Sequence, residues 1–91
     1  MRLRVVVAEL GSAEVHAVAR ELRDAGVEVI YTGPVSGPAQ VVATALQEDA
    51  DAVAVGERVD EVRELLAGAD ADDVVALPLD DVLTWVDTAS R

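Results

Sequence analysis

Short apolar runs alternate with stretches of helical periodicity along this chain, and no other feature of the sequence constrains the fold as much. The runs cover residues 3–8, 27–31, 52–55 and 74–77, and they are rich in valine. The run at residues 3–8 is typical of a strand buried on both faces, whereas Glu28 within residues 27–31 suggests an exposed place near the sheet edge. Strands that alternate with helices predict a parallel sheet with right-handed crossovers.

Four helices are expected between and after these runs, and each carries recognisable end signals. Ser12 suits the cap of the first helix and Gly26 its end, while Gly68 ends the third. Pro38 suits the first turn of the second helix, and Asp80 suits the cap of the last. The apolar residues that recur at helical spacing, and that we expect to face the sheet, are Val15, Val18, Ala19, Leu22 and Ala25; Val41, Val42, Ala45 and Leu46; Val59, Val62, Leu65 and Leu66; and Leu83 and Val86.

The charge of the chain is strongly negative. Asp and Glu number 18 against 7 arginines, lysine is absent, and the net charge is −11 over 91 residues. Such a chain repels polyanions and anionic membranes, so we expect neither nucleic acid nor a membrane as partner. Two interpretations of the acidity stay open. One is a docking surface for a basic partner, and the other is adaptation to a salty cytoplasm, since the composition resembles that of proteins from halophilic archaea.

The length and composition allow one small globular domain, covering residues 1–91. Cysteine is absent, which excludes disulfides and thiolate metal sites. No apolar run reaches the ~18 residues of a membrane span, and no charged-then-apolar segment opens the chain. We therefore expect a cytoplasmic location.

Residues 17–33 read Ala-Val-Ala-Arg-Glu-Leu-Arg-Asp-Ala-Gly-Val-Glu-Val-Ile-Tyr-Thr-Gly. This stretch closely resembles the cobalamin-binding domain of the methylmalonyl-CoA mutase family, and the resemblance covers most of residues 2–55. It implies a flavodoxin-like α/β fold, a three-layer open parallel sheet with helices on both faces. The family's fifth strand does not fit into this chain, so we expect about four strands in the order 2-1-3-4.

The motifs that bind the cofactor in this family are absent from the matching positions. The family places Asp-x-His-x-x-Gly after the first strand, and its histidine ligates cobalt; here those positions hold Glu9, Gly11 and Glu14. Ser-x-Leu after the third strand is replaced by Gly-Glu-Arg at residues 56–58, and Gly-Gly after the fourth by Leu-Pro at residues 77–78. We therefore predict no cobalamin bound in the family's mode and no other cofactor.

Any ligand site is expected beyond the carboxyl ends of the strands, where open parallel sheets bind their ligands. The residues expected to line this crevice are Gly11, Ser12, Thr32, Gly33, Ser36 and Gly56. Turn chemistry explains Gly33 and Gly37 better than a phosphate cradle, because no phosphate-binding glycine motif is present. His16, the one histidine, is interpreted as part of a polar helix face. We predict no metal site and no catalytic residue, since no nucleophile stands beside a base.

The predicted function is that of a non-catalytic interaction or regulatory module, derived from a cobalamin-binding domain and accessory to a cobalamin-dependent mutase. The alternative is a binder of a small molecule at the carboxyl ends of the strands: base-on cobalamin, an acyl-CoA or a nucleotide. The expected partner is another protein or a second copy of the chain. Without a fifth strand and its helix, apolar surface should stay uncovered at residues 74–77 and, on the last helix, at Val82, Trp85 and Val86.

Overall fold

Strands and helices alternate strictly in the computed structural model, which describes residues 2–11 and 15–89. Within these residues the strands are β1 (Arg4–Glu9), β2 (Glu28–Pro34), β3 (Ala52–Val55) and β4 (Val75–Pro78). The helices are α1 (Val15–Asp24), α2 (Pro38–Gln47), α3 (Val59–Gly68) and α4 (Leu79–Ala89). The predicted alternation is confirmed, whereas the predicted cap Ser12 and the motif position Glu14 lie outside the described residues.

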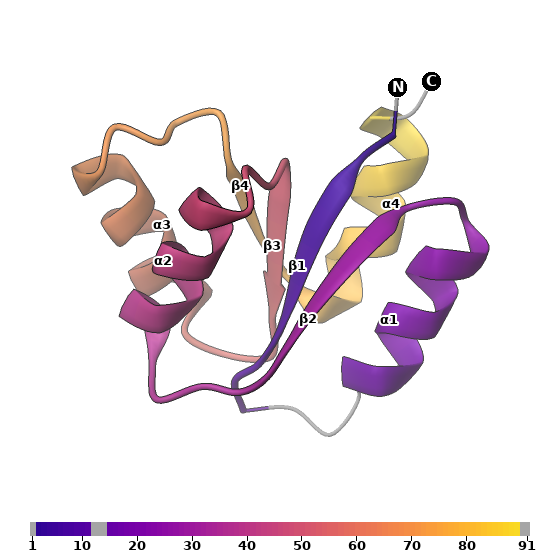
Figure 1. Ribbon diagram of the computed structural model, residues 1–91, viewed down its shortest axis with the longest axis horizontal. Coiled ribbons are helices and arrows are strands. Elements are labelled where there is room, and N and C mark those ends of the chain that lie inside the picture. The colour runs from indigo at the N-terminus through magenta and orange to yellow at the C-terminus, as the bar shows by residue number, and fades with distance from the viewer. Residues whose placement is uncertain (1, 12–14, 90–91) are drawn as a thin grey trace.

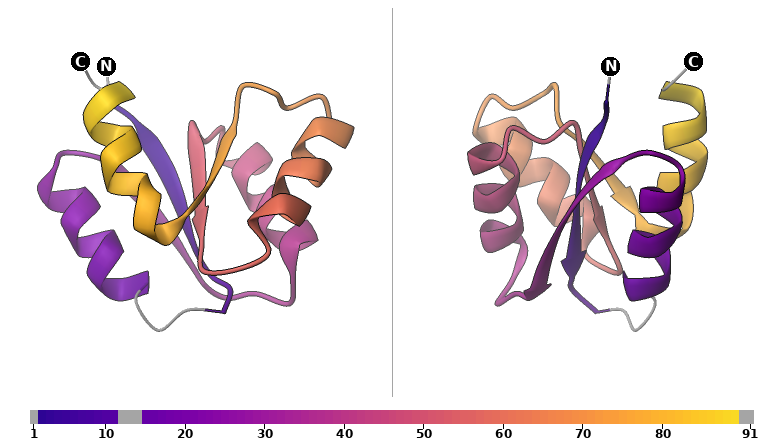
Figure 2. Two further views of the ribbon diagram at one scale, coloured as in Figure 1. Left: turned by 180° about the vertical axis from the view of Figure 1, so that it is seen from behind. Right: turned by 45° about the vertical axis from the view of Figure 1, so that its right-hand side comes forward.

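The strands form one parallel sheet in the order β2-β1-β3-β4. Helices α1 and α4 cover one face of the sheet, and α2 and α3 cover the other (Figure 1 and Figure 2). This is the flavodoxin-like open sheet that the sequence predicts, with helices on both faces. Because all strands are parallel, their carboxyl ends meet at one edge of the sheet.

The continuous valine runs are explained by burial on both faces of the sheet. In β1, Val5 and Val7 pack toward α1 and α4, whereas Val6 and Ala8 pack toward α2 and α3. All four side chains are fully buried, and β3 is buried along its whole length in the same way. A central strand with a helical layer on each side does not alternate apolar with polar residues, because neither of its faces reaches water.

Three of the helices end in the same hydrogen-bond pattern. In each, the N–H of a left-handed residue donates to the carbonyl three residues back, and the next N–H donates to the carbonyl five residues back. The left-handed residues are Gly26 (φ 87°), Asp49 (φ 54°) and Asp70 (φ 58°). The residues that follow them are buried: Val27, Ala50 and Ala71. Gly68 is therefore the last residue of α3, as predicted, but the chain makes its left-handed turn at Asp70.

Strand β2 extends three residues beyond its predicted end at residue 31, through Thr32 and Gly33 to Pro34. Its pairing with β1 contains a bulge, since Val7 lies opposite Tyr31 but Glu9 lies opposite Pro34. The extra residue needs a local kink, and Gly33 has φ 72°, a conformation that side chains with a Cβ rarely adopt. Gly33 thus serves the end of a strand and not an open loop.

The partner surface predicted on the last helix is wrong for two of its three residues. Val82 and Val86 are 0% and 4% exposed, and they pack with Leu79 against the sheet. Helix α4 begins directly after β4, without a separate capping residue at Asp80, and it returns along the face that α1 also covers (Figure 2). It therefore covers the apolar surface itself. The sequence assigns Val86 both to the inward face and to the partner surface, and the inward position is confirmed. Trp85 is partly buried.

Neighbouring segment 74–77 is also covered rather than open. Ala76 is buried, and Val74, Val75 and Leu77 pack partly buried against the two cores. Helices cover this segment too, because α3 and α4 lie on opposite faces of the sheet beside β4.

Three residues predicted to face the sheet lie on the surface instead. Ala25 follows the end of α1 and is exposed. Leu46 on α2 is 45% exposed and Leu65 on α3 is 41% exposed. Both leucines stand at the margin of a helical stripe whose centre is buried, so periodicity alone assigns them to the core.

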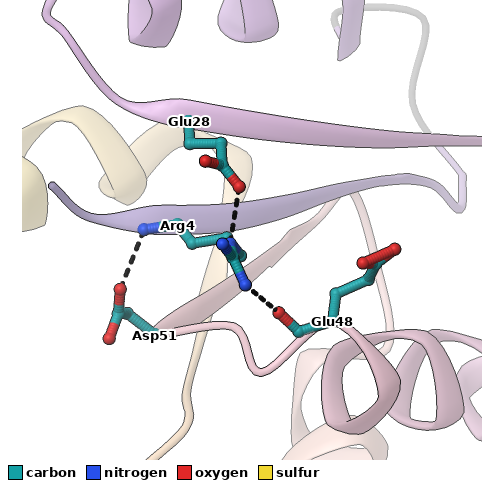
Figure 3. A network of polar contacts seen from close by, with 4 residues as sticks. All are labelled: Arg4, Glu28, Glu48 and Asp51. Atoms are coloured by element: carbon teal, nitrogen blue, oxygen red, sulfur yellow. Dashed lines mark hydrogen bonds and ion pairs between the residues drawn. The ribbon is translucent and has the colours of Figure 1, made fainter.

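At the amino ends of the strands, Arg4 links β1 to β2 and to the connection between α2 and β3 (Figure 3). Its Nε donates to Glu28 Oε2 at 2.6 Å, and its Nη1 donates to the carbonyl of Glu48, just after α2, at 2.7 Å. Its backbone N–H donates to Asp51 Oδ2 at 2.8 Å. One guanidinium therefore links β1 to β2 and to the carbonyl end of a helix, where a positive charge is favourable.

Candidate functional site

The predicted crevice residues that the structure describes do lie at the carboxyl edge of the sheet. Gly11 follows β1 and Gly56 follows β3, Thr32 and Gly33 belong to the end of β2, and Ser36 lies between β2 and α2. In Figure 1 this edge is at the bottom of the molecule. Ser12 lies outside the described residues.

Polar groups at this edge are bonded to their own neighbours in the chain. The Thr32 hydroxyl donates to the carbonyl of Gly33 at 2.8 Å. The backbone N–H and the hydroxyl of Ser36 both donate to Gln40 Oε1, at 2.9 and 3.0 Å. The N–H of Gly56 donates to the carbonyl of Leu10 at 3.1 Å, which closes the turn after β1 onto the end of β3. These bonds hold the edge together and do not converge on a shared point.

Gly11 is the position that the resemblance aligns with the cobalt-ligating histidine. A Cβ at residue 11 would collide with the side chain of Glu57, which follows β3, unless that side chain moved. Residues 56–58, to which Glu57 belongs, are the ones that the resemblance aligns with Ser-x-Leu. The Glu57 carboxylate thus occupies the space beside residue 11.

A cluster of three titratable side chains lies beside this edge and is missed by the sequence analysis. The Tyr31 hydroxyl donates to Glu9 Oε2, and it lies 3.4 Å from His16 Nε2. The rings of His16 and Tyr31 are tilted against each other with centroids 4.9 Å apart. The hydrogen bond to the Glu9 carboxylate, with burial and the charge of Glu9, raises the pKa of Tyr31 above its usual value.

Three different segments contribute to this cluster, which is why no local motif reveals it. Only the alternation of β2 offers a signal, because it places Tyr31 on the same face as Val29 and hence toward α1. His16 is exposed, as expected of a polar helix face, but it also contacts a neighbour.

Arg58 marks the start of α3 at the same edge. It has left-handed backbone geometry (φ 60°) and precedes the helix as its N-cap residue. Its guanidinium holds Glu61 with two bonds, Nε to Oε1 at 2.9 Å and Nη2 to Oε2 at 2.8 Å. These bonds lower the pKa of the Glu61 carboxyl. The Arg58 guanidinium is therefore engaged by the helix that it precedes.

None of the predicted crevice residues that the structure describes lines the three hollows described on the surface. One at the amino ends of the strands is lined by Arg2, Arg4, Glu28, Asp49 and Asp51, and two others flank α3. Across residues 2–11 and 15–89, no three His, Cys, Asp or Glu side chains gather as the ligands of a metal ion. In the same residues, no helix has the length and apolarity that crossing a membrane requires.

These features define a small open-sheet α/β domain whose carboxyl edge is closed by its own side chains. The sequence matches no protein-family model. It is similar to the 2-hydroxyisobutanoyl-CoA mutase small subunit of Aquincola tertiaricarbonis, with 47% identity over 57 residues. The match covers 58% of this chain and 42% of that subunit, so the chain spans less than half the length of its relative. This relative and the family that residues 17–33 resemble are both mutases of acyl-CoA compounds.

Proposed function

We propose that this chain is a non-catalytic module that serves a cobalamin-dependent acyl-CoA mutase as an accessory part. The observation that carries the proposal is the 47% identity with a mutase small subunit. The fold agrees with it, since a flavodoxin-like sheet in the order 2-1-3-4 is what the resemblance to the cobalamin-binding domain implies. The module keeps the scaffold of that domain and differs at its carboxyl edge.

Cobalamin held through a histidine does not fit the residues at this edge. Gly11 carries no ligand atom, and Glu57 fills the adjacent space. Glu9 and Glu57 also bring carboxylates to the two turns that the family uses for the cofactor. These substitutions support a role in contact with a partner protein over a role in holding the cofactor.

Catalysis by the module alone is disfavoured by the same geometry. The Tyr31 hydroxyl is bonded to Glu9, and Arg58 is bonded to Glu61. The titratable groups at this edge are thus hydrogen-bonded to one another. In a catalytic site, by contrast, a nucleophile or base faces the substrate.

Binding to a mutase tests the proposal directly. The full chain would be titrated into the purified catalytic subunit of an acyl-CoA mutase encoded in the same genome, followed by calorimetry and by mutase activity. We expect a complex with a fixed stoichiometry and a changed turnover. Absence of binding at about 100 μM, a concentration at which even weak specific contacts are detectable, would refute the accessory role.

A titration with hydroxocobalamin tests the cofactor part separately. We expect no change in the visible spectrum of the kind that histidine ligation produces, in the wild type or in His16→Ala. A ligation spectrum that disappears in His16→Ala would contradict the proposal. Retention of hydroxocobalamin in equilibrium dialysis with an unchanged spectrum would instead support the alternative, a binder of base-on cobalamin.

A further inference from the structure

Helices α2 and α3 lie side by side over one face of the sheet, and their outer surface is not covered by any described part of the chain (Figure 2). Among the described residues, two large apolar side chains are exposed, and both belong to this surface: Leu46 on α2 and Leu65 on α3. Their helical spacing predicts that both side chains are buried in the core. In the structure each is instead an exposed apolar side chain.

A hollow of about 420 Å³ is lined by residues of both helices and of the turn after α3, and Leu65 is one of them whereas Leu46 is not. Small or apolar side chains form most of its lining, together with one acid. The residues that line it are Ala39, Val42, Glu64, Leu65, Gly68 and Ala69. An apolar projection and an apolar hollow therefore share one surface.

No contact or backbone conformation within the described chain requires glycine at position 68. It is the last residue of α3, its backbone is not left-handed, and a Cβ there would meet no atom within 4 Å. Glycine in a helix costs about 0.8–1 kcal/mol relative to alanine. A neighbouring helix that approaches closely over residue 68 gives a reason for keeping the side chain absent.

Charge distribution also distinguishes this surface. Helix α2 carries no charged residue, although the chain has a net charge of −11. Just before α3, Arg58 is paired with Glu61, and within α3 Arg63 is paired with Asp60, so Glu64 is the one acid of this helix outside these ion pairs. At ~0.1 M salt, charges farther than ~10 Å from a contact are screened. Two copies can therefore approach through α2 with less repulsion than through the acidic remainder.

We propose that the α2–α3 surface is a self-association face, on which two copies of the chain pack around a twofold axis. Leu46 and Leu65 of each copy enter the hollow of the other. A twofold axis pairs a surface with itself, so projection and hollow must lie on the same patch, as they do here. The proposal goes beyond the function proposed above and does not depend on it.

The size of the surface sets the strength of the dimer. Each helix has 10 residues, so the pair covers a footprint of ~15 by ~20 Å. With surface relief this corresponds to roughly 1,000 Å² buried in total, at the lower limit for a specific interface. We therefore expect a reversible dimer with a dissociation constant on the order of 10 μM.

Sedimentation equilibrium of the full chain tests the proposal. We expect a mass that rises with concentration from one chain of 9.5 kDa to two. Leu46→Glu and Leu65→Glu should each raise the dissociation constant at least about tenfold, because a carboxylate would be buried in an apolar hollow. Ala17→Glu is the matched control, since it adds the same charge at an exposed position of α1, on the opposite face. It should leave the dimer unchanged.

Gly68→Leu separates docking from stability. Leucine is the better helix former, so the monomer should become more stable. The same side chain fills the hollow, so the dimer should weaken. Four outcomes would overturn the proposal: a monomer at every concentration and salt, equal effects of Ala17→Glu and Leu65→Glu, a Gly68→Leu variant that dimerises as well as the wild type, or a stable oligomer larger than two.

Discussion

Replacing Asp70 by glycine should stabilise this protein, although Asp70 lies in an exposed turn and the replacement deletes a side chain. Asp70 has φ 58°, and it forms the left-handed turn after α3. The corresponding position after α1 is already a glycine, Gly26. The chain thus contains the same turn once with a Cβ and once without. The cost of the Cβ can therefore be measured by removing it from one turn and by adding it to the other.

The magnitude has two parts. A left-handed backbone costs a residue with a Cβ about 1–2 kcal/mol, and the greater freedom of unfolded glycine offsets about 0.5–1 kcal/mol of that gain. An acid near a helix C-terminus also opposes the helix dipole by about 0.3–1 kcal/mol. Asp70→Ala removes the carboxylate and keeps the Cβ, whereas Asp70→Gly removes both. We expect the glycine variant to exceed the alanine variant by about 1 kcal/mol.

Urea unfolding at low micromolar concentration measures these differences, and for a domain of this size 1 kcal/mol corresponds to about 4–8 °C in Tm. Gly26→Asp is the reciprocal variant. A Cβ at residue 26 would meet no atom within 4 Å, so any loss of stability there reports the backbone and not a collision. The reasoning would be refuted if Asp70→Gly were no more stable than Asp70→Ala, or if Gly26→Asp were neutral, with unchanged m-values.

Other predictions concern the amino ends of the strands, their carboxyl ends and the net charge. Arg4→Ala should lower the free energy of unfolding by about 1–2 kcal/mol, since it removes the bonds to Glu28 and to the carbonyl of Glu48; equal stability in urea would contradict this. Tyr31 is the one tyrosine, so phenolate absorbance reports it alone, and its pKa should lie above the usual value of about 10 and fall in Glu9→Gln. Because the folded pKa is raised, this bond contributes stability below about pH 10 and loses it as the pH rises further. The Tm should rise between ~0.1 and ~2 M KCl as salt screens the self-repulsion; a flat profile would favour the docking-surface interpretation of the acidity.

Sequence patterns predict the helices and strands, because these depend on local signals. Continuous valine in residues 52–55 indicates burial on both faces, and Pro38 starts a helix wherever its neighbours permit one. The resemblance of residues 17–33 then fixed the order of strands, which periodicity alone leaves open. The bulge at Gly33 was not predictable, since it depends on how β2 pairs with a strand that lies earlier in the chain.

Coverage of an apolar face was the property that the sequence predicted least well. The stripe on α4 was expected to lack cover because a fifth strand is missing, but α4 itself occupies that place beside α1. The stripes on α2 and α3 are predicted to be buried whole, but Leu46 and Leu65 are exposed. Periodicity in the sequence shows that a helix has an apolar face. How many residues of that face are buried depends on how the other helices and strands pack against it.

Positions of the two ends of the described chain have a consequence for how such a module can be used. β1 begins and α4 ends at the same end of the molecule, opposite the carboxyl edge of the sheet (Figure 1). A longer polypeptide could therefore enter and leave the module from one side, and linkers at both ends would leave the carboxyl edge free. The same fold can serve as a separate subunit or as a unit inserted within a larger chain. Gene fusion and gene fission would then interconvert the two arrangements without refolding the sheet.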